Sequence, residues 1–222
     1  MLKRSPALIL AAAVASLLVA PHLAMAANST PAIAAFDAAF AKTSQFTYKL
    51  RAHETKGSSV QDRLYDYSFM KPHFAKTLIE SGDGKGSGAV WAGGDQVSGH
   101  QGGFLSGIHL KISLHDARAV SLRGYTIPDG LPQNIIAKYT SIPGKLSQAP
   151  GGKIDGVPTD RVQLVVANPA TNDGISEQVV YLSQVTHFPL REILYSGSQV
   201  VLDQSFLNWN FNPGLTANDF PF

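Results

Sequence analysis

The 222-residue chain carries 18 Lys and Arg, 16 Asp and Glu, and no cysteine. This near balance of charge gives no electrostatic support for nucleic-acid binding, and the lack of cysteine excludes disulfides and a lipidated N-terminal cysteine. The length suffices for one domain with a sizeable core.

Residues 1–26 have the pattern of a signal peptide. Lys3 and Arg4 precede an apolar run over 7–20, and Ala24-Met25-Ala26 matches a signal-peptidase site, so we expect cleavage after Ala26. Removing two of the 18 basic residues would leave a balanced mature chain. An exported chain without cysteine favours the bacterial periplasm, and we expect a single domain over 27–222.

The first predicted element is a helix over 31–45. Thr30 is a suitable N-cap and proline follows at the first helical position. Ile33, Phe36 and Phe40 recur at helical spacing and form an apolar stripe. We therefore expect this helix to cover a sheet.

Two stretches that follow, 46–53 and 64–69, alternate apolar and polar residues, which predicts antiparallel strands. Pro72 then marks a turn, and 74–80 reads as the returning strand. The aromatic and aliphatic residues that share one face of the first two strands are Phe46, Tyr48, Leu50, Tyr65, Tyr67 and Phe69.

Glycine is dense between 82 and 107, which predicts tight turns around short strands near 89–91 and 96–98. The apolar spacing over 105–114 fits either a strand or a short helix. Gly84-Lys85 is followed by glycine instead of Ser or Thr, so this segment does not match a phosphate-binding loop.

The remaining chain is predicted to form a helix over 131–140 and four further strands, at 162–166, 178–183, 190–195 and 199–211. In the last strand, Val201, Leu207, Trp209 and Phe211 are expected on one face. The pattern as a whole predicts an α+β protein, a mostly antiparallel sheet with two or three helices.

A row of Tyr and Phe on a strand is more often packed core than ligand pocket. Two features favour a pocket here. The long half-polar sheet has few amphipathic helices to cover it, and buried tyrosines need partners for their hydroxyl groups.

Several short motifs resemble the outer-membrane lipoprotein carrier (LolA) superfamily. These are Lys71-Pro72-His73-Phe74 at the second strand, the turn from Thr186 to Arg191, and the ending Phe220-Pro221-Phe222. The resemblance, to a divergent branch of that superfamily, implies a curved, incomplete antiparallel β-barrel (a half-barrel) covered by helices. Carriers typically have an arginine that contacts the lid where this chain has Lys71.

We accordingly expect a periplasmic, non-enzymatic protein that binds a lipid or a lipoprotein acyl chain in an aromatic-lined cavity, without a cofactor or metal. The wall residues expected to bind the ligand are Phe46, Tyr48, Leu50, Tyr65, Tyr67, Phe69, Phe74 and Trp91. The lid residues expected are Ile33, Phe36, Phe40, Lys71, Ile135 and Ile136.

Two alternatives remain at this point. The sheet would serve a sensor or scaffold module that grips an envelope partner protein. Less expected is a hydrolase or metal-dependent enzyme that uses the glycine-rich segment with His100, His109 or His115, because these spacings match no short zinc motif.

Overall fold

The computed structural model describes residues 29–103 and 107–221. The predicted signal peptide, and Leu105 at the start of the ambiguous 105–114 stretch, lie outside the described residues. The strands of the described chain are β1 Gln45–Lys56, β2 Ser59–Met70, β3 Phe74–Gly82, β4 Gly88–Trp91, β5 Gln96–His100, β6 Leu110–Ser113, β7 Gly144–Ile154, β8 Val157–Val166, β9 Glu177–Ser183, β10 Pro189–Ser196 and β11 Gln199–Asn210. The α-helices are α1 Pro31–Lys42 and α2 Pro132–Ser141.

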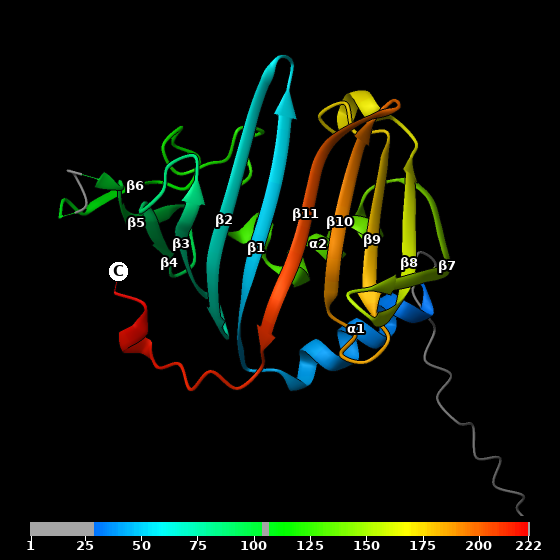
Figure 1. Ribbon diagram of the computed structural model, residues 1–222, viewed down its shortest axis with the longest axis horizontal. Coiled ribbons are helices and arrows are strands. Elements are labelled where there is room, and N and C mark those ends of the chain that lie inside the picture. The colour runs from blue at the N-terminus through cyan, green and yellow to red at the C-terminus, as the bar shows by residue number, and fades with distance from the viewer. Residues whose placement is uncertain (1–28, 104–106, 222) are drawn as a thin grey trace, which may run out of the picture.

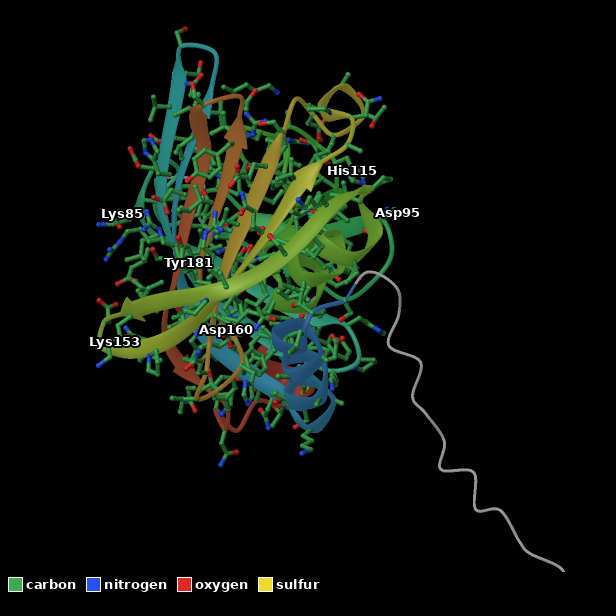
Figure 2. The ribbon with its side chains drawn as sticks, turned by 90° about the vertical axis from the view of Figure 1, so that its right-hand side faces the viewer. Lys85, Asp95, His115, Lys153, Asp160 and Tyr181 are labelled. Atoms are coloured by element: carbon green, nitrogen blue, oxygen red, sulfur yellow. The ribbon has the colours of Figure 1, made fainter. Side chains whose placement is uncertain are left out.

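All eleven strands belong to one antiparallel sheet in the order β6-β5-β4-β3-β2-β1-β11-β10-β9-β8-β7 (Figure 1). Within the described residues β6 and β7 are the two edges and do not pair, so the sheet stays open. Both helices lie on one side of it (Figure 2). The predicted fold class, an incomplete curved barrel with two or three covering helices, is confirmed.

Helix α1 begins as its sequence predicts. The Thr30 hydroxyl accepts a hydrogen bond from the backbone N–H of Ile33 at 3.4 Å, and Pro31 occupies the first helical position. The helix ends at Lys42, three residues earlier than predicted, because Thr43 is already extended and β1 starts at Gln45. Ile33 and Phe36 are buried and Phe40 is half-buried.

The long hairpin of β1 and β2 forms the centre of the molecule (Figure 1). Its register pairs Phe46 with Phe69 and Tyr48 with Tyr67, so the aromatic residues of both strands share the face that the helices cover. The predicted alternation of these strands is confirmed, and Pro72 lies in the turn that follows β2.

The predicted face of β11 is partly wrong. Asn208 has a positive φ of 55°, and the pairing with β1 shifts register at this point. The extra residue is a β-bulge, which reverses the alternation. Phe206 is consequently buried before the bulge and Trp209 turns to the same side after it, their rings 6.1 Å apart.

Strand β7 was not predicted, because Pro150, Gly151 and Gly152 interrupt any apolar alternation. It forms nonetheless as an edge strand paired with β8, with its register shift between Pro150 and Gly152. An edge strand tolerates proline because one of its sides makes no ladder hydrogen bonds.

None of the helices in the described ranges has the length and apolar character needed to cross a membrane.

Candidate functional site

The inner face of the sheet, meaning the face on the side of the helices, is packed solid where α1 and α2 cover it. The Phe46 ring lies 4.9 Å from that of Phe69 and 5.8 Å from that of Phe188, centroid to centroid. Phe36 of α1 contacts Phe188 at 5.3 Å. These side chains are fully buried, so this half of the sheet has a dry aromatic core.

The other half of the inner face is hollow. A cavity of about 650 Å³ lies over β2 to β6, beneath the connection that leads from β6 to α2. Its volume is within the roughly 300–1,000 Å³ of sites that hold small molecules. The apolar lining residues are Tyr65, Tyr67, Ile79, Ala89, Val97, Ile108, Leu110, Ile112, Ala117, Ala119, Val120, Tyr125 and Ile127. We call this the apolar cavity.

The register of the strands explains why this half is hollow. Tyr67 pairs with Thr77, Thr77 with Ala89, and Ala89 with Gly99. Side chains along this cross-strand row therefore become smaller from β2 to β5, and the row ends at Leu110 on the edge strand β6. A Cβ on Gly99 would approach the Gly88 carbonyl oxygen to 2.7 Å, so this position accepts no larger residue.

The cover of the apolar cavity is the segment 117–127, which is held by hydrogen bonds to the central hairpin. The Ser121 hydroxyl donates to Glu54 Oε2 at 2.7 Å, and the Arg123 backbone N–H donates to the same oxygen at 3.0 Å. The Leu122 N–H donates to Gln61 Oε1 at 3.0 Å. Hydrogen bonds to the side chains of Glu54 and Gln61 thus help to hold this cover, whereas helices cover the other half of the inner face.

A second cavity of about 310 Å³ adjoins the first across the same segment. The two share five lining residues, Tyr65, Tyr67, Ser121, Tyr125 and Thr126. Its charged lining residues are Glu54, Arg123, Asp129, Lys138, Asp173 and Glu192. We call it the polar cavity.

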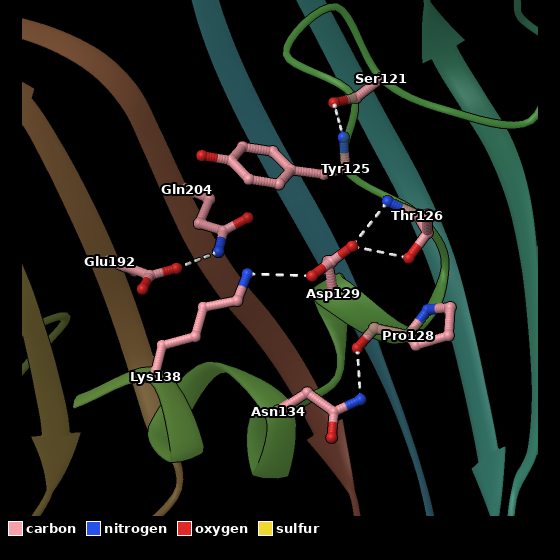
Figure 3. Close-up of polar contacts among 9 residues, drawn as sticks. All are labelled: Ser121, Tyr125, Thr126, Pro128, Asp129, Asn134, Lys138, Glu192 and Gln204. Atoms are coloured by element: carbon pink, nitrogen blue, oxygen red, sulfur yellow. Dashed lines mark hydrogen bonds and ion pairs between the residues drawn. The ribbon is translucent and has the colours of Figure 1, made fainter. Parts of the chain in front are cut away.

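Figure 3 shows the polar groups at the floor of this cavity. Lys138 of α2 forms an ion pair with Asp129 at 3.0 Å, and Asp129 also accepts from the Thr126 hydroxyl. Glu192 accepts hydrogen bonds from Gln204 Nε2 and, at 3.4 Å, from the Tyr139 hydroxyl. Burial raises the pKa of Glu192, against the opposing effect of nearby Lys138.

The chain resembles known proteins in structure and not in sequence. No family model matches the sequence, and no curated protein matches it. The structure of MucB superposes with a TM-score of 0.52 at 12% identity, over 87% of this chain and 64% of MucB. The Mycobacterium tuberculosis lipoprotein LppX gives 0.50 at 15% identity, over 83% of this chain and 95% of LppX.

The chain has the fold of MucB and LppX. A LolA superfamily protein from Nitrosomonas europaea is also similar, with 10% identity and a TM-score of 0.36 over 87% of this chain and 99% of that protein. The open, curved antiparallel sheet with covering helices that was predicted from the sequence is confirmed at the level of the fold.

In this fold some of the predicted wall residues line the cavities and others do not. Tyr65 and Tyr67 line both cavities, and Leu50 lines the polar one. Phe46, Tyr48 and Phe69 lie in the dry core beneath the helices. The wall predicted from the sequence is therefore brought together, but of its residues on β1 and β2 only Leu50, Tyr65 and Tyr67 border open volume.

The other two predicted wall residues lie away from both cavities. Phe74 is on the opposite face of β3, with its ring 5.8 Å from that of Phe220. Trp91 packs beside the core, and its indole N–H donates to the Gly94 carbonyl at 2.8 Å.

The predicted lid residues border the dry core. Ile135 and Ile136 of α2 are buried there with Ile33 and Phe36 of α1. The ammonium group of Lys71 donates to the carbonyl of Phe40 at 2.7 Å and lies 4.3 Å from the centre of its ring. Lys71 thus contacts the C-terminal end of α1 as a point charge.

Sequence reasoning missed most of the apolar cavity. Ile79, Val97 and Ile112 lie on its wall, and the segment 117–127 covers it. The alternation of β3 carried a usable signal for Ile79, since it shares parity with Thr77. The covering segment has no periodicity that would have placed it.

The predicted metal-dependent alternative rested on three histidines. The rings of His100 and His109 lie 5.2 Å apart. Throughout the part of the chain that the structure describes, no three His, Asp or Glu side chains are grouped so as to hold a metal ion.

Proposed function

We propose that this is an exported, periplasmic binding or carrier protein without enzymatic activity, and that it shelters a lipid-like acyl chain in the apolar cavity. The observation that carries the proposal is the cavity itself, about 650 Å³ beside a fully packed core. A protein interior is normally close-packed, so a hollow of this size with apolar walls is suited to a guest.

The energetics support an acyl chain as the guest. Each methylene transferred from water contributes about 0.8 kcal/mol, so ten of them contribute roughly 8 kcal/mol. Association costs an estimated 4–15 kcal/mol, so a single chain would bind with useful but reversible affinity when the costs are at the lower end of that range. Reversible binding is what a carrier requires.

The test uses two neighbouring residues of β3 that point to opposite faces. Ile79 lines the apolar cavity, whereas Leu78 is exposed on the outer face. We expect Ile79→Asp to weaken binding of a fluorescent fatty acid by at least about tenfold, because the substitution places a charge against the acyl chain of the ligand. Leu78→Asp is expected to bind like the wild type.

Circular dichroism of both variants checks that the sheet is intact. Equal weakening by both substitutions, with folding preserved, would remove the cavity from the mechanism. Mass spectrometry of organic extracts of the protein, purified from its native envelope, would identify the natural cargo.

A second candidate is a module that binds a partner protein. It is favoured by one comparison, since MucB has been determined in complex with MucA. A stable protein partner recovered with the purified protein, without co-purifying lipid, would support this candidate over the carrier.

A further inference from the structure

The apolar cavity has three cationic side chains and one histidine in its lining. These residues are Arg63, Lys85, His100 and Arg118, and no Asp or Glu is among the described lining residues. The polar cavity, in contrast, has four carboxylates and two cations in its lining. An anionic group bound next to the acyl chain of the guest is therefore favoured at the apolar cavity and disfavoured at the polar cavity.

Arg63 is the basic residue best placed to bind such an anion. It lies on β2, where alternation puts it on the same inner face as Tyr65 and Tyr67. Its Nε–H donates to the carbonyl of Asp83 at 2.8 Å, and Nη1 donates to the Tyr65 hydroxyl at 3.2 Å. The guanidinium group is thus held at the cavity wall by two uncharged acceptors.

These contacts leave the Arg63 charge without a counter-ion. Within the described residues Arg63 forms no ion pair, and its Nη2 makes no hydrogen bond. Arginine presents its donors as a planar fork that matches a carboxylate. A guanidinium group fixed in position and not neutralised is suited to an anionic head group.

The other three basic residues are less available. Arg118 donates to both oxygens of Asp116, each at 2.8 Å. Lys85 lies in the turn between β3 and β4, and its side chain projects away from the body of the protein (Figure 2). His100 packs against His109. None of the three offers an anion in the cavity a comparable fixed charge.

Resting on the proposed function, we propose that the guest is a single-chain amphiphile with a carboxylate head group. The carboxylate binds Arg63, and the chain extends along the row from Thr77 through Ala89 to Gly99. Head-group charge would then determine which amphiphiles the protein selects.

The experiment compares dodecanoate with dodecanol, which have the same chain, by calorimetry on the wild type, Arg63→Gln and Arg51→Gln. Arg51 is exposed on the opposite face of β1, so its variant is a control for charge alone. We expect the wild type to bind dodecanoate about tenfold more tightly than dodecanol, as a charge-assisted contact predicts. Arg63→Gln should lose that preference, and Arg51→Gln should keep it.

Arg63→Lys provides a second reading if the glutamine variant unfolds. The lysine variant keeps the positive charge but loses the planar pair of N–H donors, so it should retain part of the preference for dodecanoate. Equal binding of the two ligands by the wild type, or an unchanged preference in folded Arg63→Gln, would overturn the head-group inference and leave the carrier proposal intact. Binding of neither ligand by the wild type would overturn both.

Discussion

Tyr48 and Tyr67 show how one aromatic row divides between core and cavity. Their rings stack at 5.0 Å, and the Tyr48 hydroxyl donates to the Gly130 carbonyl at 2.7 Å. A side chain at Gly130 would collide with the Tyr67 hydroxyl, so glycine is required there. Burial raises the pKa of both tyrosines well above the ordinary value, so both stay neutral.

Glu192 is predicted to make stability depend on pH. Burial raises the pKa of Glu192 in the folded protein, so the contribution of this residue to the stability of the folded state is fully present below its ordinary pKa of 4.5. That contribution is lost as the pH rises through the raised pKa. Glu192→Gln has no carboxyl group to ionise. We therefore expect the stability of the variant relative to the wild type to improve from about pH 4 to about pH 8.

Urea denaturation across that pH range measures the effect. Asp95→Asn is the control, because Asp95 is exposed in the turn before β5 and its side chain forms no ion pair in the described chain (Figure 2). A constant stability difference between Glu192→Gln and the wild type would contradict a buried carboxyl group with a raised pKa.

At the scale of elements, the sequence predicted both helices and most strands. The alternation of apolar and polar residues identified β1 and β2, because one face of these strands is buried and the other is exposed to solvent. This is the condition under which apolar residues recur at every second position. It failed at Asn208 and at β7. In both places tertiary pairing, a bulge in one case and an edge position in the other, overrides the local pattern.

The site was less predictable than the fold. Alternation places Tyr65 and Tyr67 on the inner face, but it does not reveal whether a helix or a hollow lies opposite them. That difference depends on the sizes of Thr77, Ala89 and Gly99, which come together only through strand register. Single-sequence periodicity carries no information on such cross-strand rows.

The contact between Lys71 and α1 is predicted to stabilise the docking of that helix. A cation at a helix C-terminus contributes about 0.3–1 kcal/mol, and up to about 2 kcal/mol where it is partly buried. We expect Lys71→Met to lower the free energy of unfolding by about 1 kcal/mol, measured by urea denaturation. Lys71→Arg should recover most of this loss.

Lys42→Met is the matched control, since Lys42 is exposed in the last turn of the same helix. Its loss is expected to be smaller because its side chain makes no hydrogen bond to the helix carbonyls within the described residues. A loss as large as that of Lys71→Met would show that general charge, and not the contact with Phe40, matters.

At the scale of the whole molecule, the two halves of the open sheet have different roles. The side from β1 to β9 is stabilised by two helices and a dry core, and it can therefore support a side from β2 to β6 that is incompletely filled (Figure 1). The covering segment 117–127 is anchored by hydrogen bonds to β1 and β2 and by the burial of Ile127.

This division predicts that a guest stabilises the folded state by filling the hollow. A ligand at one hundred times its dissociation constant adds about 2.7 kcal/mol. For a chain of this size that raises the melting temperature by roughly 5–10 °C. We expect dodecanoate to do so for the wild type in differential scanning calorimetry.

Ala89→Phe tests whether the stabilisation comes from the hollow. Ala89 is half-buried in the middle of the row whose small side chains leave the apolar cavity open. A phenyl ring there occupies the volume of the guest, so the folded variant should show little or no response to dodecanoate. If the variant responds as strongly as the wild type, the ligand binds elsewhere, and the packing of this half of the sheet then has no bearing on carriage.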